Sequence, residues 1–170
     1  MQRILITGNA GSGKTTAARR LATKLGTLPH HLDQIVWCSG WRKVELDRKN
    51  SNIERLTSGP KWIIDGVSTK AMDSADIILF IDLPRSRCLS RVIERAFRFG
   101  LRQRPEMPSG CPELHGLLKA IKITWRFQHN ARLIILKKIG DFGNSKKIFH
   151  VKNVDQLDLV LEQIAELART

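Results

Sequence analysis

The sequence predicts a three-layer α/β domain with a five-stranded parallel sheet. Short apolar runs bounded by turn residues alternate along the chain with longer segments whose apolar residues recur at helical spacing. A glycine-rich loop separates the first apolar run from the first helical segment. The length of 170 residues is that of one ordinary domain, large enough to bury a core without disulfides.

The apolar runs give the strands, and the periodic segments give the helices. The expected strands are Arg3–Thr7, Pro29–Asp33, Lys61–Asp65, Ile77–Asp82 and Lys147–Val151. The expected helices are Lys14–Leu25, Leu46–Thr57, Pro84–Phe99, Glu113–Lys138 with a possible break, and Val154–Ala168. In the last helix the apolar residues share one face, as in an amphipathic helix that covers a sheet.

One irregular stretch interrupts this alternation between Gly100 and Pro112, where prolines and glycines lie among basic residues. Such a composition disfavours regular structure, so we interpret the stretch as a mobile basic loop. It forms most of a lid that we expect over residues 98–113, within a single domain of residues 1–170. A second irregular stretch, Gly140–Ser145, is expected to be a surface turn.

The segment Gly8–Thr15 satisfies the pattern G-x-x-x-x-G-K-[ST], between an expected strand and an expected helix. This is the context that the phosphate-binding P-loop requires, because successive N–H groups and the helix N-terminus then point at an anion. Lys14 is expected to bridge the β- and γ-phosphates of ATP, and the Thr15 hydroxyl to bind Mg²⁺. The remaining residues expected to contact ATP are Gly8, Asn9, Ala10, Gly11, Ser12, Gly13 and Thr16.

A magnesium site in such a protein also needs a carboxylate at the end of a neighbouring strand. Asp65 and Asp82 each end an apolar run, where open α/β sheets bind their ligands. We favour Asp65 as the metal-side residue, because the glycine after it permits a tight turn above the loop. Asp82 precedes Pro84 and is expected to start the next helix.

The formal net charge of +13 is concentrated in one half of the chain. Residues 84–150 contain 15 Lys and Arg and 4 Asp and Glu, a net +11. This half is therefore expected to meet an anion: nucleotide phosphates, nucleic acid or an acidic partner. The cysteines, Cys38, Cys88 and Cys111, form no C-x-x-C pair, and neither a signal peptide nor a membrane-spanning run is visible, so we expect a cytoplasmic protein with no membrane partner.

Elements along nearly the whole chain resemble those of known families. After the phosphate-binding loop they are His31-Leu32-Asp33, Trp37, Gly40-Trp41, Trp62-Ile63-Ile64-Asp65-Gly66, Asp82-Leu83-Pro84-Arg85, Cys88-Leu89, Arg91-Val92-Ile93, Arg95, Arg104-Pro105-Glu106-Met107, Gly110-Cys111-Pro112-Glu113 and Trp125. The chain resembles the P-loop nucleoside-monophosphate kinase group, which includes adenylate and shikimate kinases. It resembles more closely a bacterial family called "DNA topology modulation protein".

These resemblances imply a P-loop NTPase fold with the strand order 2-3-1-4-5, an acceptor pocket near Asp33, a metal-side carboxylate at Asp65 and a mobile basic lid. By the likeness to shikimate kinase, Asp33 orients the acceptor or takes its proton. The chain departs from the family pattern in the segment Val67–Ser74, which is shorter and lacks an Asn-Tyr pair and an arginine. Either the acceptor differs, Lys70 or Arg42 replaces the missing cation, or transfer is reduced.

Arginines are dense ahead of the expected lid. Arg91, Arg95, Arg98 and Arg102 recur at i, i+4, i+7 and i+11, which places them on one face if the helix extends that far. With Arg104 they are expected to stabilise the charge of a phosphoryl group in transfer, and the alternative is a solvated basic face. Arg91 and Arg95 are the expected catalytic arginines, because they match the spacing seen ahead of the lid in related kinases.

Two tryptophans, Trp37 and Trp41, are candidates to stack on an aromatic acceptor, although we expect one of them to pack in the core. His30 and His31 accompany no metal-binding set in the sequence and are interpreted as structural. The sequence thus favours γ-phosphoryl transfer from ATP, with Mg²⁺, to a small acceptor. The alternatives are a nucleic-acid-associated ATPase and a nucleotide-binding regulator.

Overall fold

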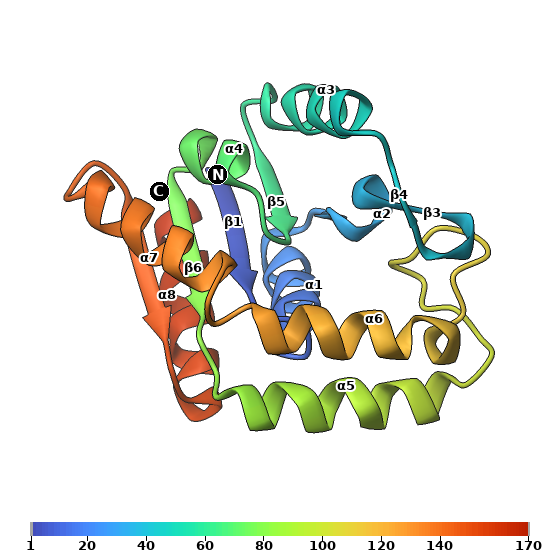
Figure 1. Ribbon diagram of the computed structural model, residues 1–170. Helices are drawn as coiled ribbons and strands as arrows, with labels where there is room; N and C mark the ends of the chain where they lie inside the picture. The colour runs from blue at the N-terminus through green and yellow to red at the C-terminus, as the bar shows by residue number, and fades with distance from the viewer. Residues whose placement is uncertain (1, 170) are drawn as a thin grey trace.

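A parallel sheet of five strands forms the centre of the molecule in the computed structural model, which describes residues 2–169 (Figure 1). The strands are β1 (Arg3–Gly8), β2 (Pro29–His31), β5 (Trp62–Asp65), β6 (Ile77–Ile81) and β7 (Lys147–Val151). Their order is β2-β5-β1-β6-β7, and every neighbouring pair is parallel. The first strand therefore lies in the middle, and the carboxyl ends of all five strands meet at one edge.

Two further strands, which the sequence analysis did not anticipate, lie outside this sheet. β3 (Trp37–Cys38) and β4 (Arg42–Lys43) pair with each other in an antiparallel ribbon, joined by the 3₁₀ turn η1 (Ser39–Trp41). Counted without them, the five strands of the main sheet run in the order 2-3-1-4-5. The observed order β2-β5-β1-β6-β7 thus differs from the expected 2-3-1-4-5 only because β3 and β4 are numbered between strands of the main sheet.

Helices cover both faces of the sheet, which makes three layers. Because side chains alternate along a strand, Ile4 and Ile6 of β1 pack toward α1 (Lys14–Leu25) and α8 (Leu157–Arg169). Leu5 packs in a second cluster on the opposite face. The helices that reach this second cluster are α3 (Leu46–Thr57), α4 (Thr69–Ser74) and α7 (Ala131–Phe142).

The helices α5 (Arg85–Phe99) and α6 (Glu113–Arg126) run antiparallel and pack against each other along one side of the molecule (Figure 1). The remaining helical elements are the short α2 (Asp33–Val36) and the 3₁₀ turn η2 (Val154–Gln156) ahead of α8. No helix in the described part of the chain combines the length and the apolar character needed to cross a membrane.

The second strand ends earlier than expected, which changes the place of Asp33. The Leu32 N–H still donates to the Asp65 carbonyl at 2.9 Å, but the Leu32 carbonyl accepts hydrogen bonds from the N–H groups of Ile35 and Val36. The chain therefore turns into α2, and Asp33 is its first residue rather than the last residue of a strand. Leu32 fills this corner, because its side chain packs where a Cβ on Gly66 would stand.

The expected helix Glu113–Lys138 is divided into α6 and α7. An unbroken helix over this span would be about 39 Å long, more than the diameter of a small domain. The turn after the buried Phe127 instead brings Ile135 of α7 into the core. The helix α4 was also missed, although Ser68 provides the usual N-terminal signal: its side chain accepts a hydrogen bond from the Ala71 N–H at 3.3 Å.

The expected lid segment contains no helix or strand over residues 101–112, but it is packed rather than loose. Met107 and Cys111 form a small buried cluster with Trp37 and Trp41 of the ribbon region. Glu106 is buried and pairs with Arg19 on α1. The structure thus shows this segment in a single packed arrangement, and its mobility stays a prediction.

Candidate functional site

The loop between β1 and α1 forms the centre of the candidate site. Gly11 and Gly13 have φ angles of 77° and 98°, values that L-residues with a side chain rarely adopt. A Cβ on Gly11 would lie 2.3 Å from the Cys88 carbonyl oxygen of α5. Glycine at these positions therefore lets the loop curl while α5 packs directly against it, and the N-terminus of α1 faces into the curl.

A buried hydroxyl in this loop has no partner inside the protein. The Ser12 Oγ is buried, and no hydrogen bond reaches it from any described residue. The neighbouring Asn9 is held on one side only: its side-chain N–H donates to the Thr124 carbonyl of α6 at 3.0 Å, whereas its Oδ1 is buried without a partner among the described residues. An unpaired buried donor is costly unless a ligand satisfies it. The loop therefore fits an anion such as a phosphate.

Lys14 lies at the start of α1 and turns back over the loop. Its Nζ donates to the Asn9 carbonyl at 2.8 Å. Burial lowers the pKa of Lys14 from its ordinary value, whereas the nearby charges of Asp33 and Asp65 act in the opposite sense. Lys14 is partly exposed, and its ammonium group lies near two carboxylates and the loop, where it would interact with a phosphate.

Asp65 ends β5, beside the central strand, and meets the loop at Thr15. The Thr15 Oγ1 donates to Asp65 Oδ2 at 2.6 Å. Burial alone would raise the pKa of Asp65, but hydrogen bonds from His31 and Thr15 and the charge of Lys14 outweigh it, so the pKa is lowered. An ionised carboxylate beside a hydroxyl is the oxygen donor set that Mg²⁺ prefers.

These two residues suit a magnesium ion that takes its other ligands from water and phosphate. Among residues 2–169, no three His, Cys, Asp or Glu side chains gather as a metal cluster of their own. Mg²⁺ in phosphoryl-transfer sites is normally held by one or two protein groups and the substrate phosphates. Thr15 and Asp65 fit that arrangement.

His31 is a site residue that the sequence analysis missed. Its Nδ1 forms a hydrogen bond with Asp65 Oδ1, so Asp65 is held from both sides, by His31 and by Thr15. The parallel pairing of β2 with β5 places His31 directly opposite Asp65. Asp65 ends an expected strand, but the strand expected over Pro29–Asp33 runs two residues past His31, and which strands are neighbours is not visible in the sequence.

Asp82, the other carboxylate considered for the metal, is occupied elsewhere. Arg132 of α7 donates to both of its oxygens, at 2.9 to 3.1 Å, and His150 Nε2 lies 3.0 Å from Oδ2. Burial tends to raise the pKa of Asp82, and the Arg132 and His150 hydrogen bonds lower it overall. Asp82 thus connects β6 to α7 and β7. Because Asp65, and not Asp82, contacts Thr15, the geometry supports Asp65 as the metal-side carboxylate.

Three of the five expected arginines approach the loop or the acceptor side. Arg91 Nη1 lies 3.8 Å from where a Cβ on Gly13 would stand. Arg95 donates to Glu113 Oε2 at 3.0 Å, and Arg104 binds the other oxygen of the same carboxylate. Glu113 is only 2% exposed and was not singled out from the sequence. This single buried carboxylate positions two guanidinium groups that the sequence separates by nine residues.

The other two arginines face away from this cluster. The Arg98 side chain is 70% exposed and pairs with Glu94 one turn earlier. Arg102 is also exposed. The helical spacing predicted a common face for Arg91, Arg95, Arg98 and Arg102, but α5 ends at Phe99, and the chain turns there. The structure therefore does not bring Arg98 and Arg102 to the loop.

On the acceptor side, Asp33 is half exposed and lies 3.9 Å from Arg104. Trp37 and Trp41 are both buried and pack edge to face, with ring centroids 5.5 Å apart. Trp41 Nε1 donates to the Pro112 carbonyl at 2.8 Å. Both tryptophans therefore pack the ribbon against the lid segment, where packing had been expected for one of them.

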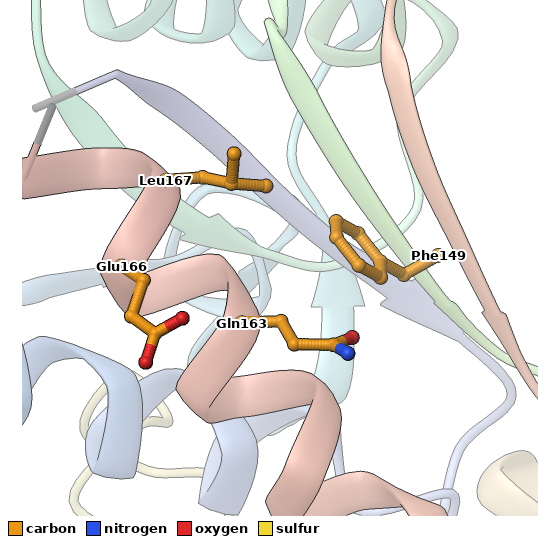
Figure 2. A pocket seen from close by; sticks show the side chains of 4 residues that line it. All are labelled: Phe149, Gln163, Glu166 and Leu167. Carbon is orange, nitrogen blue, oxygen red and sulfur yellow. The ribbon is translucent and has the colours of Figure 1, made fainter.

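Two cavities of the protein lie away from the loop Gly8–Thr15. The larger one, about 430 Å³, lies between β7 and α8 and is lined by Phe149, Gln163, Glu166 and Leu167 (Figure 2). None of these residues belongs to the expected site. A second cavity of about 270 Å³ has residues of α3, α4 and α7 in its lining, Ile53, Lys70 and Ile135 among them. Neither of these two cavities contains a residue of the candidate site, which is defined by its side chains.

Comparison with known proteins supports the fold. No protein-family model and no curated protein matches the sequence. Among solved structures, the chain is similar to shikimate kinase from Acinetobacter baumannii, solved in complex with shikimate, with a TM-score of 0.57, 19% identity, and coverage of 99% of this chain and 93% of that chain. It is also similar to a sugar kinase from Janibacter sp. HTCC2649, solved without a ligand, with a TM-score of 0.48, 16% identity, and coverage of 97% and 90%.

At 19% identity the likeness to shikimate kinase shows the fold alone. The chain thus has a three-layer α/β fold similar to that of shikimate kinase, with its glycine-rich loop between β1 and α1. The closer resemblance to the DNA topology modulation family stays a prediction.

Proposed function

We propose that this protein is an ATP-dependent phosphotransferase that moves the γ-phosphoryl group of ATP to a small acceptor. The observation that carries the proposal is the contact between Thr15 and Asp65 beside the glycine-rich loop. It joins a hydroxyl and an ionised carboxylate at the place where a P-loop kinase needs its metal. The arginines of α5 supply the positive charge that the transferred group requires.

The loop and Lys14 hold the donor. Backbone N–H groups of Gly8–Thr15 bind the phosphates, and the unpaired Ser12 hydroxyl adds one more donor. Lys14 exchanges its present bond to the Asn9 carbonyl for the β- and γ-phosphates, and neutralises charge that moves during transfer. The partly buried position of Lys14 strengthens this effect, because water screens its charge less than it would on the open surface.

Thr15 and Asp65 hold Mg²⁺, with His31 fixing the orientation of the carboxylate. When bound there, the ion would supply positive charge that offsets the negative charge of the phosphates. Asp65 is suited to this role because its lowered pKa keeps it ionised.

Arg91 and Arg95 stabilise the transferred group, and Arg104 and Asp33 bind the acceptor. Glu113 holds Arg95 and Arg104 in fixed directions, so less rotamer entropy is lost when an anion arrives. Asp33 orients the acceptor hydroxyl or takes its proton. Trp37 and Trp41 contribute by packing behind the lid segment rather than by stacking on the acceptor.

The decisive experiment is a screen of nucleoside monophosphates, nucleosides and small alcohols for acceptor-dependent ADP release. One acceptor class is expected to accelerate ADP release in the wild-type protein. In the matched Lys14→Ala variant the acceleration should fall by about 10²-fold or more, with the circular dichroism spectrum unchanged, because the ammonium group serves the phosphates and not the core.

Other outcomes would identify the alternatives. Duplex DNA that accelerates ATP hydrolysis, while every small acceptor is inert, would replace this proposal with a nucleic-acid-associated ATPase. Tight ATP binding without turnover under any condition would indicate a nucleotide-binding regulator. Wild-type turnover in folded Lys14→Ala protein would contradict the assigned role of the loop.

A further inference from the structure

The turn between β3 and β4 contains a residue with an unusual backbone conformation. Trp41, at the end of η1, has a φ of 56°, and it is the one non-glycine residue with a positive φ among residues 2–169. A bulky side chain rarely adopts this left-handed region, and the strain persists only where the surroundings impose it. The contacts of Trp41 therefore show which part of the protein imposes this conformation.

The contacts that hold Trp41 come from the beginning of α6. Its indole Nε1 donates to the Pro112 carbonyl at 2.8 Å, and the Lys119 Nζ donates to the Trp41 carbonyl at 2.6 Å. Its ring packs on Gly116, where an added Cβ would stand 2.2 Å away. Pro112, Gly116 and Lys119 recur at i, i+4 and i+7 and so share one face. This face binds both the indole and the main chain of the tryptophan.

The residues next to Trp41 are fastened to the lid segment. The Gly40 N–H donates to the Gly110 carbonyl at 2.8 Å, and the Cys111 Sγ donates to the Cys38 carbonyl at 3.3 Å. In Figure 1 the segment between α5 and α6, drawn in yellow, lies beside β3. The ribbon and the lid segment therefore form one packed unit, with Trp41 inside its buried cluster.

The turn of α6 that Trp41 holds also carries Glu113. The Glu113 carboxylate binds Arg95 and Arg104, so the direction of both guanidinium groups depends on where it stands. Glu113 follows Pro112 directly, and the indole hydrogen bond therefore acts one residue away from it. A shift of this helix turn would move both arginines together.

The ribbon leads in the other direction to Asp33. β3 follows α2 directly, and α2 begins with Asp33. The Arg104 Nη2 lies 3.9 Å from the Asp33 carboxylate on the acceptor side. Trp41 thus joins the element that carries Asp33 to the helix turn that orients Arg104.

We propose that Trp41 is a positioning residue for phosphoryl transfer, which sets how far Arg104 stands from Asp33. Trp41 is buried against α6, so it acts through Glu113 and not on the acceptor itself. Groups that are held in place before the acceptor arrives lose less rotamer entropy when they bind it. The proposal rests on the proposed phosphotransferase function, because it assigns Trp41 a part in that reaction.

Two lysines of α6 supply a matched pair of variants. Lys119 reaches the Trp41 carbonyl, whereas Lys122 is exposed on the same helix. Lys119→Met removes the bond to Trp41 without opening the core, and Lys122→Met makes the same chemical change away from Trp41. Trp41→Phe is the third variant, which keeps an aromatic ring and removes the N–H that binds the Pro112 carbonyl.

The first measurement is hydrogen–deuterium exchange followed by mass spectrometry, which requires no substrate. We expect exchange within residues 101–113 to rise at least about tenfold in Lys119→Met and in Trp41→Phe, because the start of α6 loosens. Lys122→Met should exchange like the wild-type protein. Wild-type exchange in both Lys119→Met and Trp41→Phe, or an equal rise in Lys122→Met, would overturn the proposal.

The second measurement is acceptor-dependent ADP release, with the acceptor class found for the wild-type protein. Lys119→Met should raise the acceptor KM at least about fivefold and change the Mg·ATP affinity less than about twofold, because the loop and Asp65 are untouched. Loss of packing alone would lower the folded fraction, and hence the turnover, with both constants unchanged. In a Glu113→Gln background, Lys119→Met should raise the acceptor KM by less than about a further twofold, since Trp41 acts through Glu113.

The kinetic results distinguish this inference from the proposed function. Wild-type protein without acceptor-dependent ADP release would contradict the phosphotransferase function itself. Normal wild-type turnover, with an unchanged acceptor KM in Lys119→Met or with fully additive losses in the double variant with Glu113→Gln, would overturn the role of Trp41 alone.

Discussion

Asp33 and Asp65 both lie near Lys14 but have different partners. Asp65 is buried between Thr15 and His31, whereas Asp33 is half exposed and faces Arg104. The buried carboxylate of Asp65, held by a hydroxyl and an imidazole, suits a metal ligand. The half-exposed carboxylate of Asp33 suits contact with an acceptor. The two residues should therefore fail in different ways when they are changed.

We predict that Asp65→Asn weakens the apparent Mg²⁺ affinity by about 10- to 100-fold and slows ATP hydrolysis with and without acceptor, because both reactions need the metal. Asp33→Asn should raise the acceptor KM and leave Mg·ATP affinity nearly unchanged. Mg²⁺ and acceptor titrations on both variants measure the difference. Equal loss of Mg·ATP affinity in the two proteins would show that the roles are divided wrongly.

Arg91 and Arg102 carry the same side chain in different surroundings, and this makes them a matched pair. Arg91 approaches Gly13 of the loop, while Arg102 is exposed beyond the end of α5. We predict that Arg91→Ala lowers kcat/KM by about 10²-fold and that Arg102→Ala changes it less than about twofold. The measurement is steady-state ADP release.

The same two variants test the alternative hypothesis that the basic half of the chain, residues 84–150, binds nucleic acid. If the arginines serve DNA phosphates, each loss should weaken DNA binding similarly and reduce its salt dependence by a similar amount. Salt-dependent DNA binding that falls in both proteins, with turnover intact, would refute the role of Arg91 in phosphoryl transfer.

At the scale of elements, two glycines in helices have opposite surroundings. Gly116 lies on the buried face of α6, where an added Cβ would stand 2.2 Å from the Trp41 ring. Gly140 lies in α7, and no atom stands within 4 Å of such a Cβ. Close packing of α6 on the ribbon region therefore depends on Gly116, whereas Gly140 has no such contact.

We predict that Gly116→Ala destabilises the protein by about 1–3 kcal/mol through overpacking, although alanine is the better helix former. Gly140→Ala should stabilise it by about 0.5–1 kcal/mol, because only the backbone entropy term remains. Urea unfolding of the two variants measures both values. A stabilised Gly116→Ala protein would mean that α6 and Trp41 are not in contact in solution.

At the scale of the whole molecule, ion pairs at aspartates connect elements that are distant in sequence. Asp76 binds Arg3 of β1 through bonds as short as 2.5 Å, and Asp82 joins α7 and β7 to β6. The Arg3 hydrogen bond lowers the pKa of Asp76, and the Arg132 and His150 contacts outweigh burial to lower that of Asp82. Asp65 shifts in the same direction.

These shifts give stability a definite pH dependence. Near and below the ordinary carboxyl pKa of 3.8, these aspartates become protonated in the unfolded chain while they are still ionised in the folded protein. The free energy of unfolding therefore falls as the pH falls. The stabilisation is present above that value and is lost as the pH drops through the lower folded pKa values. We predict that the free energy of unfolding, measured by urea unfolding at several pH values, begins to fall as the pH approaches the ordinary carboxyl pKa of 3.8 and continues to fall below it.

Asp82→Asn is the control for this pH dependence. It should unfold more easily at neutral pH and show a shallower decline in acid, because one of the shifted carboxyl groups is gone. An unchanged slope in this variant would exclude Asp82 as a source of the acid sensitivity.

The sequence by itself determined the α/β class, the place of the glycine-rich loop and most helix and strand positions. Local signals suffice for these features: apolar period, the glycine pattern of Gly8–Thr15 and the flanking turn residues are all properties of neighbouring residues. β7 and the helices α1 and α3 have the bounds that the sequence predicts. Asp65 was also predicted, because strand ends in a parallel sheet meet at one edge.

Only the tertiary structure decided which side chains meet across that edge. The pairing of β2 with β5 brings His31 to Asp65, and the turn after α5 sends Arg98 and Arg102 to solvent while Glu113 collects Arg95 and Arg104. The packing of both tryptophans has the same origin. Contacts between residues far apart in sequence depend on how elements are placed in space, and no local pattern encodes that placement.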